Sequence, residues 1–117
     1  FLAGGAGVTP FIAIFRQLYK DNKIGNNKLI FSNKTSQDII LKDEFTKMLG
    51  DNFINTLTEE DNPQYEHRKL DEDYLKEKIK NLDQYFYICG PDAMIEDIKK
   101  DLLKLGVKED KIVIEQF

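Results

Sequence analysis

The chain of 117 residues contains one cysteine, Cys89, and one histidine, His67. A single cysteine excludes an internal disulfide and any metal or iron–sulfur site built from cysteines of this chain alone, and no metal site is predicted. No apolar run approaches about 18 residues, so no transmembrane helix is predicted. Seventeen basic and 21 acidic residues are interspersed, without the basic stripe typical of nonspecific nucleic-acid binders. We therefore expect a cytoplasmic protein that neither spans a membrane nor binds nucleic acid.

The composition is otherwise that of one globular domain, with 41% hydrophobic and 32% charged residues. Short apolar runs predict five strands, at residues 1–3, 28–32, 53–58, 85–89 and 111–116. The segments between them predict four helices, at residues 9–19, 36–49, 71–82 and 92–105. This alternation predicts an α/β fold, a Rossmann-like open five-stranded parallel sheet with helices on both faces (a three-layer sandwich). Because the chain starts without Met inside the first strand, we also expect sequence before Phe1.

Two glycine–proline turns carry the functional signal. One follows the first strand and reads Gly4-Gly5-Ala6-Gly7-Val8-Thr9-Pro10; the other follows the fourth strand and reads Cys89-Gly90-Pro91-Asp92-Ala93-Met94. In a parallel sheet such turns lie at one edge, where ligands bind, so we expect the two to face one another. The glycines of the first turn allow close backbone approach to a ligand, and the helix start after it attracts pyrophosphate. The pattern G-x-G-x-x-P lacks the usual third glycine, so a purely structural tight turn is the alternative.

The role of the thiol at the end of the fourth strand stays open at this level. Cys89 is a candidate nucleophile, redox centre or small packing group. A covalent mechanism needs a nearby base, and His67 lies in a polar loop, so we reject a Cys–His hydrolase. The acidic cluster that a phosphate-binding domain of the signalling-receiver type needs after its first strand is also missing.

Three segments in this order resemble the C-terminal pyridine-nucleotide-binding domain of the ferredoxin–NADP(H) reductase superfamily: residues 1–10, 87–94 and 115–117. Residues 32–35, 38–41 and Glu44 are similar to the same family, so the likeness covers essentially the whole chain. It implies that residues 1–117 form the NAD(P)-binding domain of a flavoprotein oxidoreductase, in which hydride passes from NADH or NADPH to FAD. It further implies onward electron transfer to a carrier such as ferredoxin, flavodoxin, a haem or an iron–sulfur cluster. The partner in the same polypeptide would be an FAD-binding β-barrel, which this chain does not contain.

The resemblance also implies roles for individual residues. Cys89 would stand beside the nicotinamide, and Glu115 would support hydride transfer; these are the two predicted catalytic residues. Phe117 would cover the flavin ring. For Glu115 and Phe117 the alternatives are an exposed carboxylate and a terminal residue without fixed structure. The cofactor-binding residues would be Gly4, Gly5, Gly7, Thr9 and Pro10 at the pyrophosphate, Cys89, Gly90, Pro91 and Met94 at the nicotinamide, and Ser32, Asn33, Lys34 and Thr58 towards the adenosine.

The choice between NADH and NADPH depends on the residues after the second and third strands in this family. Residues 58–61 read Thr-Glu-Glu-Asp, which is acidic where a 2′-phosphate would need a cation, and this favours NADH. Lys34 favours NADPH instead, since a cation after the second strand could attract the 2′-phosphate, and Arg68 and Lys69 lie within reach of the same region. A non-catalytic reductase-like docking or regulatory module is the alternative function, which the intact glycine turn disfavours.

Overall fold

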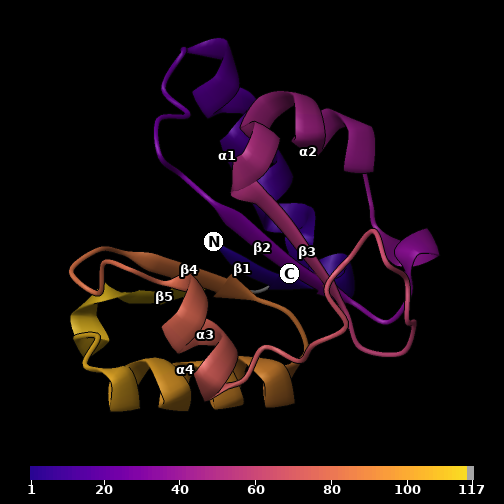
Figure 1. Ribbon diagram of the computed structural model, residues 1–117. Helices are drawn as coiled ribbons and strands as arrows, with labels where there is room; N and C mark the ends of the chain where they lie inside the picture. Colours follow the sequence, from indigo (N-terminus) through magenta and orange to yellow (C-terminus); the bar gives the residue numbers. More distant parts are fainter. Residues whose placement is uncertain (116–117) are drawn as a thin grey trace.

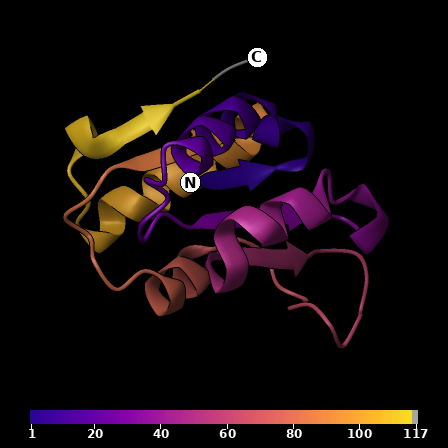
Figure 2. The same ribbon diagram turned by 90° about the horizontal axis from the view of Figure 1, so that it is seen from above.

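The computed structural model describes residues 1–115, which form a five-stranded parallel sheet in the order β3-β2-β1-β4-β5 (Figures 1 and 2). The strands are β1 (Leu2–Gly4), β2 (Leu29–Asn33), β3 (Phe53–Leu57), β4 (Phe86–Cys89) and β5 (Ile112–Ile114). The chain moves outward from β1 through β2 to β3 and then crosses to β4 on the other side of β1. This reversal between β1 and β4 is a topological switch point, the place where open α/β sheets bind ligands. The predicted fold class is confirmed.

Within residues 1–115, four α-helices cover the sheet: α1 (Thr9–Lys20), α2 (Lys42–Leu49), α3 (Glu72–Lys78) and α4 (Asp92–Leu105). Short 3₁₀ segments occupy Gly5–Val8, Ser36–Asp38, Gly50–Asn52 and Glu109–Lys111. Figure 1 shows α1 and α2 on one face and α3 and α4 on the other. Among the described residues, no helix is both long enough and apolar enough to cross a membrane.

Each face of the sheet buries its own hydrophobic cluster. Along β4, Phe86 and Ile88 pack in the cluster beneath α3 and α4, whereas Tyr87 and Cys89 belong to the one beneath α1 and α2. The alternation follows from the two-residue period of a strand. It places the Cys89 side chain on the same face as the helix that follows the first glycine turn.

The structure changes several predicted boundaries. The predicted helix at residues 36–49 is a 3₁₀ turn and a separate α2, because the chain breaks at Leu41, whose φ of 52° is left-handed. The helix predicted to reach residue 82 ends at Lys78. Among the described residues of the strand predicted at 111–116, β5 comprises Ile112–Ile114. Asp71 is the N-cap of α3: its carboxylate accepts a hydrogen bond from the Tyr74 N–H at 2.9 Å.

The polar loop between β3 and α3 folds back along the edge of the sheet. Thr56 forms a parallel bridge with Glu66, and the Leu57 N–H donates to the Glu66 carbonyl at 2.8 Å. The Thr56 hydroxyl also contacts the Arg68 carbonyl. The loop therefore pairs part of the β3 edge and is anchored where the adenosine end of the predicted site begins.

Candidate functional site

The two glycine turns contact one another at the carboxyl ends of β1 and β4. In the parallel register Ala3 pairs with Cys89, so both strands end side by side. A Cβ placed on Gly7 would lie 2.5 Å from the Gly90 Cα and 2.6 Å from the Cys89 carbonyl oxygen. Such distances leave room for no side chain, so glycine is required for the turns to approach this closely. The prediction that the two turns face one another is confirmed.

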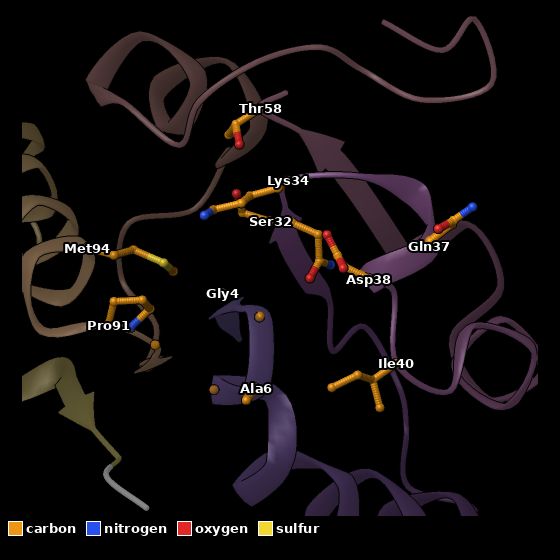
Figure 3. Close-up of a pocket in the computed structure, with 14 residues that line it drawn as sticks. Gly4, Ala6, Ser32, Lys34, Gln37, Asp38, Ile40, Thr58, Pro91 and Met94 are labelled. Atoms are coloured by element: carbon orange, nitrogen blue, oxygen red, sulfur yellow. The ribbon is translucent and has the colours of Figure 1, made fainter. Parts of the chain in front are cut away.

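A cleft of about 850 Å³ opens beside these turns (Figure 3). In Figure 3, Pro91 and Met94 border one side, Gly4 and Ala6 the middle, and the segment around Lys34 the other. The cleft is lined by three segments together with Thr58: Gly4, Gly5, Ala6 and Gly7; Ser32, Asn33, Lys34, Gln37, Asp38 and Ile40; Gly90, Pro91 and Met94. Ten predicted cofactor-binding residues therefore share one cavity: Gly4, Gly5, Gly7, Ser32, Asn33, Lys34, Thr58, Gly90, Pro91 and Met94.

The first turn presents open backbone to the cleft. Gly5 has a φ of 55°, and no heavy atom lies within 4 Å of the position that its Cβ would occupy. This positive φ favours glycine, and the space above it is a cradle into which a ligand can approach the main chain. The 3₁₀ segment Gly5–Val8 then continues directly into α1, which begins at Thr9.

Thr9 and Pro10 take a different place from the glycines. Pro10 lies in the first turn of α1. Val8 precedes the helix in helical conformation, and the Thr9 hydroxyl donates to the Ala6 carbonyl at 2.7 Å. Within residues 1–115, neither residue lines the cleft. The Thr9 hydrogen bond ties the start of α1 to the turn, and contact of Thr9 and Pro10 with a nucleotide stays a prediction.

Cys89 and Glu115 lie next to the cleft rather than along its surface. Cys89 is 1% exposed and packs in the core beneath α1, so the packing interpretation describes its present contacts. Burial raises the pKa of the Cys89 thiol above its ordinary value, and the Glu115 carboxylate raises it further. The Glu115 N–H donates to the Ile88 carbonyl at 2.9 Å, which holds this carboxylate near the end of β4. Phe117 lies outside the described residues.

The adenosine side is built by backbone pairing beyond the strands. The Thr58 N–H donates to the Asn33 carbonyl at 3.0 Å, and the Glu59 N–H donates to the Lys34 carbonyl at 2.9 Å. The sheet pairing of β2 and β3 is thereby extended by two residues. His67 is tied to this region, with its Nε2 at 3.3 Å from the Thr58 carbonyl oxygen. Since β1 and β2 separate β3 from β4, His67 lies far along the sheet from Cys89, in keeping with the rejected hydrolase.

Four cleft residues are not among the predicted cofactor-binding residues: Ala6, inside the first glycine turn, and the three residues Gln37, Asp38 and Ile40 after β2. Predicting one continuous helix over residues 36–49 hid the turn that brings the last three to the cleft. The Thr35–Asp38 pair was the available signal, because Thr followed three residues later by an acid is a capping pattern. In the structure the Asp38 Oδ2 accepts from the Thr35 N–H at 3.1 Å and from its hydroxyl at 3.0 Å.

A metal site would need several clustered His, Cys, Asp or Glu side chains. Among residues 1–115, no group of three or more His, Cys, Asp or Glu residues is arranged to hold a metal ion. The cleft instead offers glycine backbone, two amides (Asn33 and Gln37), one lysine, one carboxylate (Asp38) and two small hydroxyl side chains at the switch point of a parallel sheet. These features define a nucleotide-binding α/β domain.

Comparison with known proteins gives the family. Residues 1–100 match the oxidoreductase NAD-binding domain, and the chain belongs to that family. It is 30% identical over 122 residues to the nitrate reductase [NADPH] of Emericella nidulans, a match that covers 95% of this chain and 14% of that protein. It is also 30% identical over 129 residues to a subunit of the Na(+)-translocating NADH-quinone reductase of Klebsiella pneumoniae, covering 100% of this chain and 32% of that one.

The solved structures agree with this assignment. The flavohem-like FAD/NAD-binding domain of nitric oxide dioxygenase from Vibrio cholerae superposes with a TM-score of 0.87 at 25% identity. The match covers 99% of this chain and 49% of that one. The resemblance to the nucleotide-binding domain of the ferredoxin–NADP(H) reductase superfamily is thereby confirmed. The chain spans less than a third of the length of the two curated relatives above.

Proposed function

We propose that this chain is the nucleotide-binding part of an NAD(P)H-dependent flavoprotein oxidoreductase. One observation carries the proposal: the glycine turn after β1 and the Cys89–Gly90–Pro91 turn after β4 are in van der Waals contact at the rim of a single cleft. Because the two turns are fixed relative to one another, the two parts of a ligand that contacts both turns are held at a fixed distance. Positioning of this kind supplies most of the catalysis in hydride transfer.

The residues of the cleft fit a pyridine dinucleotide. The open space above Gly5 and the start of α1 would hold the pyrophosphate, and the segment from Ser32 to Lys34 with Thr58 would hold the adenosine. Gly90, Pro91 and Met94 would line the nicotinamide subsite, with Cys89 and Glu115 beside it. When bound, the nicotinamide supplies a hydride that FAD accepts.

The partner domain and the acceptor follow from the proteins to which the chain is similar. Relatives include one component of an NADH-quinone reductase and a nitrate reductase, and the Vibrio cholerae neighbour is an FAD/NAD-binding domain. We infer that an FAD-binding domain of the same polypeptide faces the cleft and that electrons leave the flavin for a carrier protein or domain. A cytoplasmic location belongs to the same proposal.

A titration of the intact protein with NADH and with NADPH tests this function. Reduction of the flavin bleaches its visible absorbance band, and we expect at least one nucleotide to do so under anaerobic conditions. If neither nucleotide bleaches the flavin although one of them binds, the non-catalytic docking or regulatory module becomes the better interpretation. If neither binds, the proposed function is wrong.

Replacing Cys89 by Ala tests the nicotinamide assignment separately. We expect flavin reduction to slow by roughly tenfold or more while the nucleotide Kd changes little, since a side chain beside the nicotinamide affects positioning in the transfer step. Equal loss of rate and affinity, or of thermal stability alone, would show that Cys89 only packs in the core.

We further propose that NADH is the preferred nucleotide, because one of the three acids after β3 is held in place. Glu60 is half-buried, and its carboxylate accepts hydrogen bonds from the Asn62 amide at 3.0 Å and from the Ser36 N–H at 3.5 Å. These bonds keep the pKa of Glu60 below its ordinary value, so the negative charge persists near Lys34 and Thr58. A 2′-phosphate entering this end of the cleft would meet that charge.

The comparison of Glu60→Gln with Glu59→Gln measures this preference. Glu59 is exposed and serves as the matched control, because its substitution removes the same charge from the adjacent position. We expect Glu60→Gln to improve NADPH affinity by roughly three- to tenfold with little change for NADH, and Glu59→Gln to do less. Wild-type protein that binds NADPH more tightly than NADH would contradict the preference.

A further inference from the structure

Five side chains form a polar network between helix α3 and the loop that follows β3. The loop contributes Glu66 and Arg68, and α3 contributes Tyr74, Glu77 and Lys78. The Glu66 Oε1 accepts a hydrogen bond from the Tyr74 hydroxyl at 3.1 Å and lies 3.1 Å from the Lys78 Nζ. Arg68 is paired with Glu77. None of these five residues lines the cleft in the described part of the chain, so the network lies outside the site itself.

Tyr74 is the centre of this network. Its side chain is fully buried, with the Arg68 Cζ at 4.8 Å and the Lys78 Nζ at 5.6 Å from the centroid of its ring. Burial raises the pKa of the Tyr74 hydroxyl, and the Glu66 carboxylate raises it further, so the hydroxyl stays protonated and donates. A phenylalanine would fill the same space without burying a hydroxyl. What the tyrosine adds is therefore its hydrogen bond to Glu66.

The main chain of Glu66 is bound to the sheet at the same time. Its carbonyl accepts the Leu57 N–H at 2.8 Å, and Glu66 forms a parallel bridge with Thr56. Leu57 is followed by Thr58, which lines the cleft. Because Glu66 is held by β3 through its backbone and by α3 through its carboxylate, the two ends of the loop at residues 58–66 stay together.

The first residues of this loop border the adenosine end of the proposed site. The Glu59 N–H donates to the Lys34 carbonyl at 2.9 Å, and the Glu60 carboxylate accepts from the Ser36 N–H at 3.5 Å. Both hydrogen bonds form only while the loop keeps its present course. Much of the loop is exposed, and exposed segments open locally at low free energy. The attachment of Glu66 therefore controls how much of the time the loop is in place.

We propose that Tyr74 is a positioning residue for nucleotide binding, which acts through Glu66 on the loop beside the adenosine end of the cleft. This rests on the proposed function, whose nucleotide it requires. Helix α3 thereby takes part in binding although none of its residues lines the cleft. A nucleotide that meets an ordered loop binds more tightly, because no ordering entropy is lost on binding.

Tyr74→Phe tests this role, since it keeps the buried ring and removes only the hydroxyl. We expect the Kd of the intact protein for ADP, measured by calorimetry, to rise roughly three- to tenfold. The rate of flavin reduction at saturating NADH should stay unchanged. Reduced nicotinamide mononucleotide, which lacks the adenosine, should reduce the flavin of variant and wild type equally well. The Leu57 amide, which donates to Glu66, should exchange its hydrogen faster in the variant.

Substitutions of Glu66 test the route by which Tyr74 acts. Glu66→Ala removes the acceptor, so ADP affinity should fall by a similar factor, and the double variant with Tyr74→Phe should lose no more than the weaker-binding single variant. Glu66→Gln keeps an oxygen that can accept from the Tyr74 hydroxyl, and it should retain most of the ADP affinity although its ion pair with Lys78 is lost. If Tyr74→Phe does not fold, Glu66→Ala and Glu66→Gln decide the question.

Tyr85→Phe is the matched control. Tyr85 also lies beside a lysine, with the Lys111 Nζ at 4.8 Å from its ring centroid, but it is exposed and precedes β4 at the edge of the sheet opposite the cleft. We expect its ADP affinity and the exchange of the Leu57 amide to match wild type.

Unchanged ADP affinity in Tyr74→Phe and Glu66→Ala would overturn the positioning role, even if both variants melt at a lower temperature. Additive losses in the double variant would overturn it too, as would an equal loss of reaction with reduced nicotinamide mononucleotide. Failure of wild-type protein to bind ADP or NADH would instead overturn the proposed function, and the role of Tyr74 with it.

Discussion

The contact between the two turns gives the sharpest prediction, which is made with Gly7→Ala. A methyl group on Gly7 would lie 2.5 Å from the Gly90 Cα, 2.6 Å from the Gly90 nitrogen and 2.6 Å from the Cys89 carbonyl oxygen. The shortest of these distances falls about 0.9 Å below the 3.4 Å at which ordinary contact begins. All three atoms are backbone, so no side-chain rotation relieves the clash, and the turns must move apart by nearly 1 Å.

Both stability and function should suffer from that movement. Overpacking of this kind costs about 1–3 kcal/mol. For a domain of this size that corresponds to a melting temperature lower by roughly 4–12 °C. A misplacement of about 1 Å between reacting groups slows transfer by roughly a hundredfold, so we expect a loss of that order in the rate of flavin reduction by NADH. Differential scanning calorimetry and stopped-flow absorbance measure the two effects.

Gly4→Ala is the matched control, because its Cβ would meet a flexible side chain instead. The nearest atoms would be the Met94 Sδ at 2.3 Å and its Cε at 3.1 Å, both at the far end of that side chain. We expect a loss of stability below about 1 kcal/mol, which Met94→Ala should largely restore in the double variant. Gly7→Ala protein that melts at the wild-type temperature and keeps the wild-type rate would refute the contact between the turns.

Three further predictions concern single residues. Leu41→Gly should stabilise the protein by about 0.5–1 kcal/mol in chemical denaturation, because the left-handed φ of 52° strains any residue with a Cβ; Leu41→Ala, which keeps the Cβ, should gain nothing. Asp71→Ala should cost about 1 kcal/mol through loss of the α3 cap, whereas the exposed Asp73→Ala should cost little. Alkylation of Cys89 by iodoacetamide should be slow at pH 8 and accelerate only at higher pH, because the raised pKa keeps the buried thiol protonated; rapid modification at pH 7 would contradict this.

The fold could be predicted from the sequence because local residues mark where its helices and strands begin and end. The helix predicted at residues 92–105 matches α4 from end to end, since Pro91 begins it and Gly106, with a φ of 108°, ends it. The position of β1 between β2 and β4 could be expected as well, because parallel strands joined by right-handed crossovers allow few strand orders.

The break at Leu41 could not be predicted in the same way. Residues 36–49 carry a helical pattern of apolar side chains, and local propensity gives no reason for a left-handed residue in the middle. Tertiary packing decides the conformation there: Ile39 is buried beneath α1 while Ile40 reaches the cleft, and one continuous helix could not satisfy both. Cleft residues whose position depends on such a turn therefore cannot be predicted from the periodicity of apolar residues.

The sequence also could not predict which face of the sheet carries the Cys89 side chain. A strand period of two places Tyr87 and Cys89 on one face of β4 but does not say which helices cover that face. The thiol proved to be in the core beneath α1, with only its backbone reaching the turn that meets Gly7. A role at the nicotinamide therefore requires the buried sulfur to act on a ligand in a cleft that its side chain does not line, and Cys89→Ala tests this directly.

The contact at Gly7 also accounts for the unusual glycine pattern. In the common dinucleotide fingerprint the third glycine allows a helix to pack closely on a strand. Here Pro10 stands at that spacing, inside the first turn of α1, and the close approach is made three residues earlier, by Gly7 against the turn after β4. The glycine requirement has thus moved from a helix–strand contact to a contact between two ligand-binding turns. A fold that only had to bind pyrophosphate would gain nothing from this arrangement, whereas one that must hold both ends of a dinucleotide in register gains the fixed distance that hydride transfer demands.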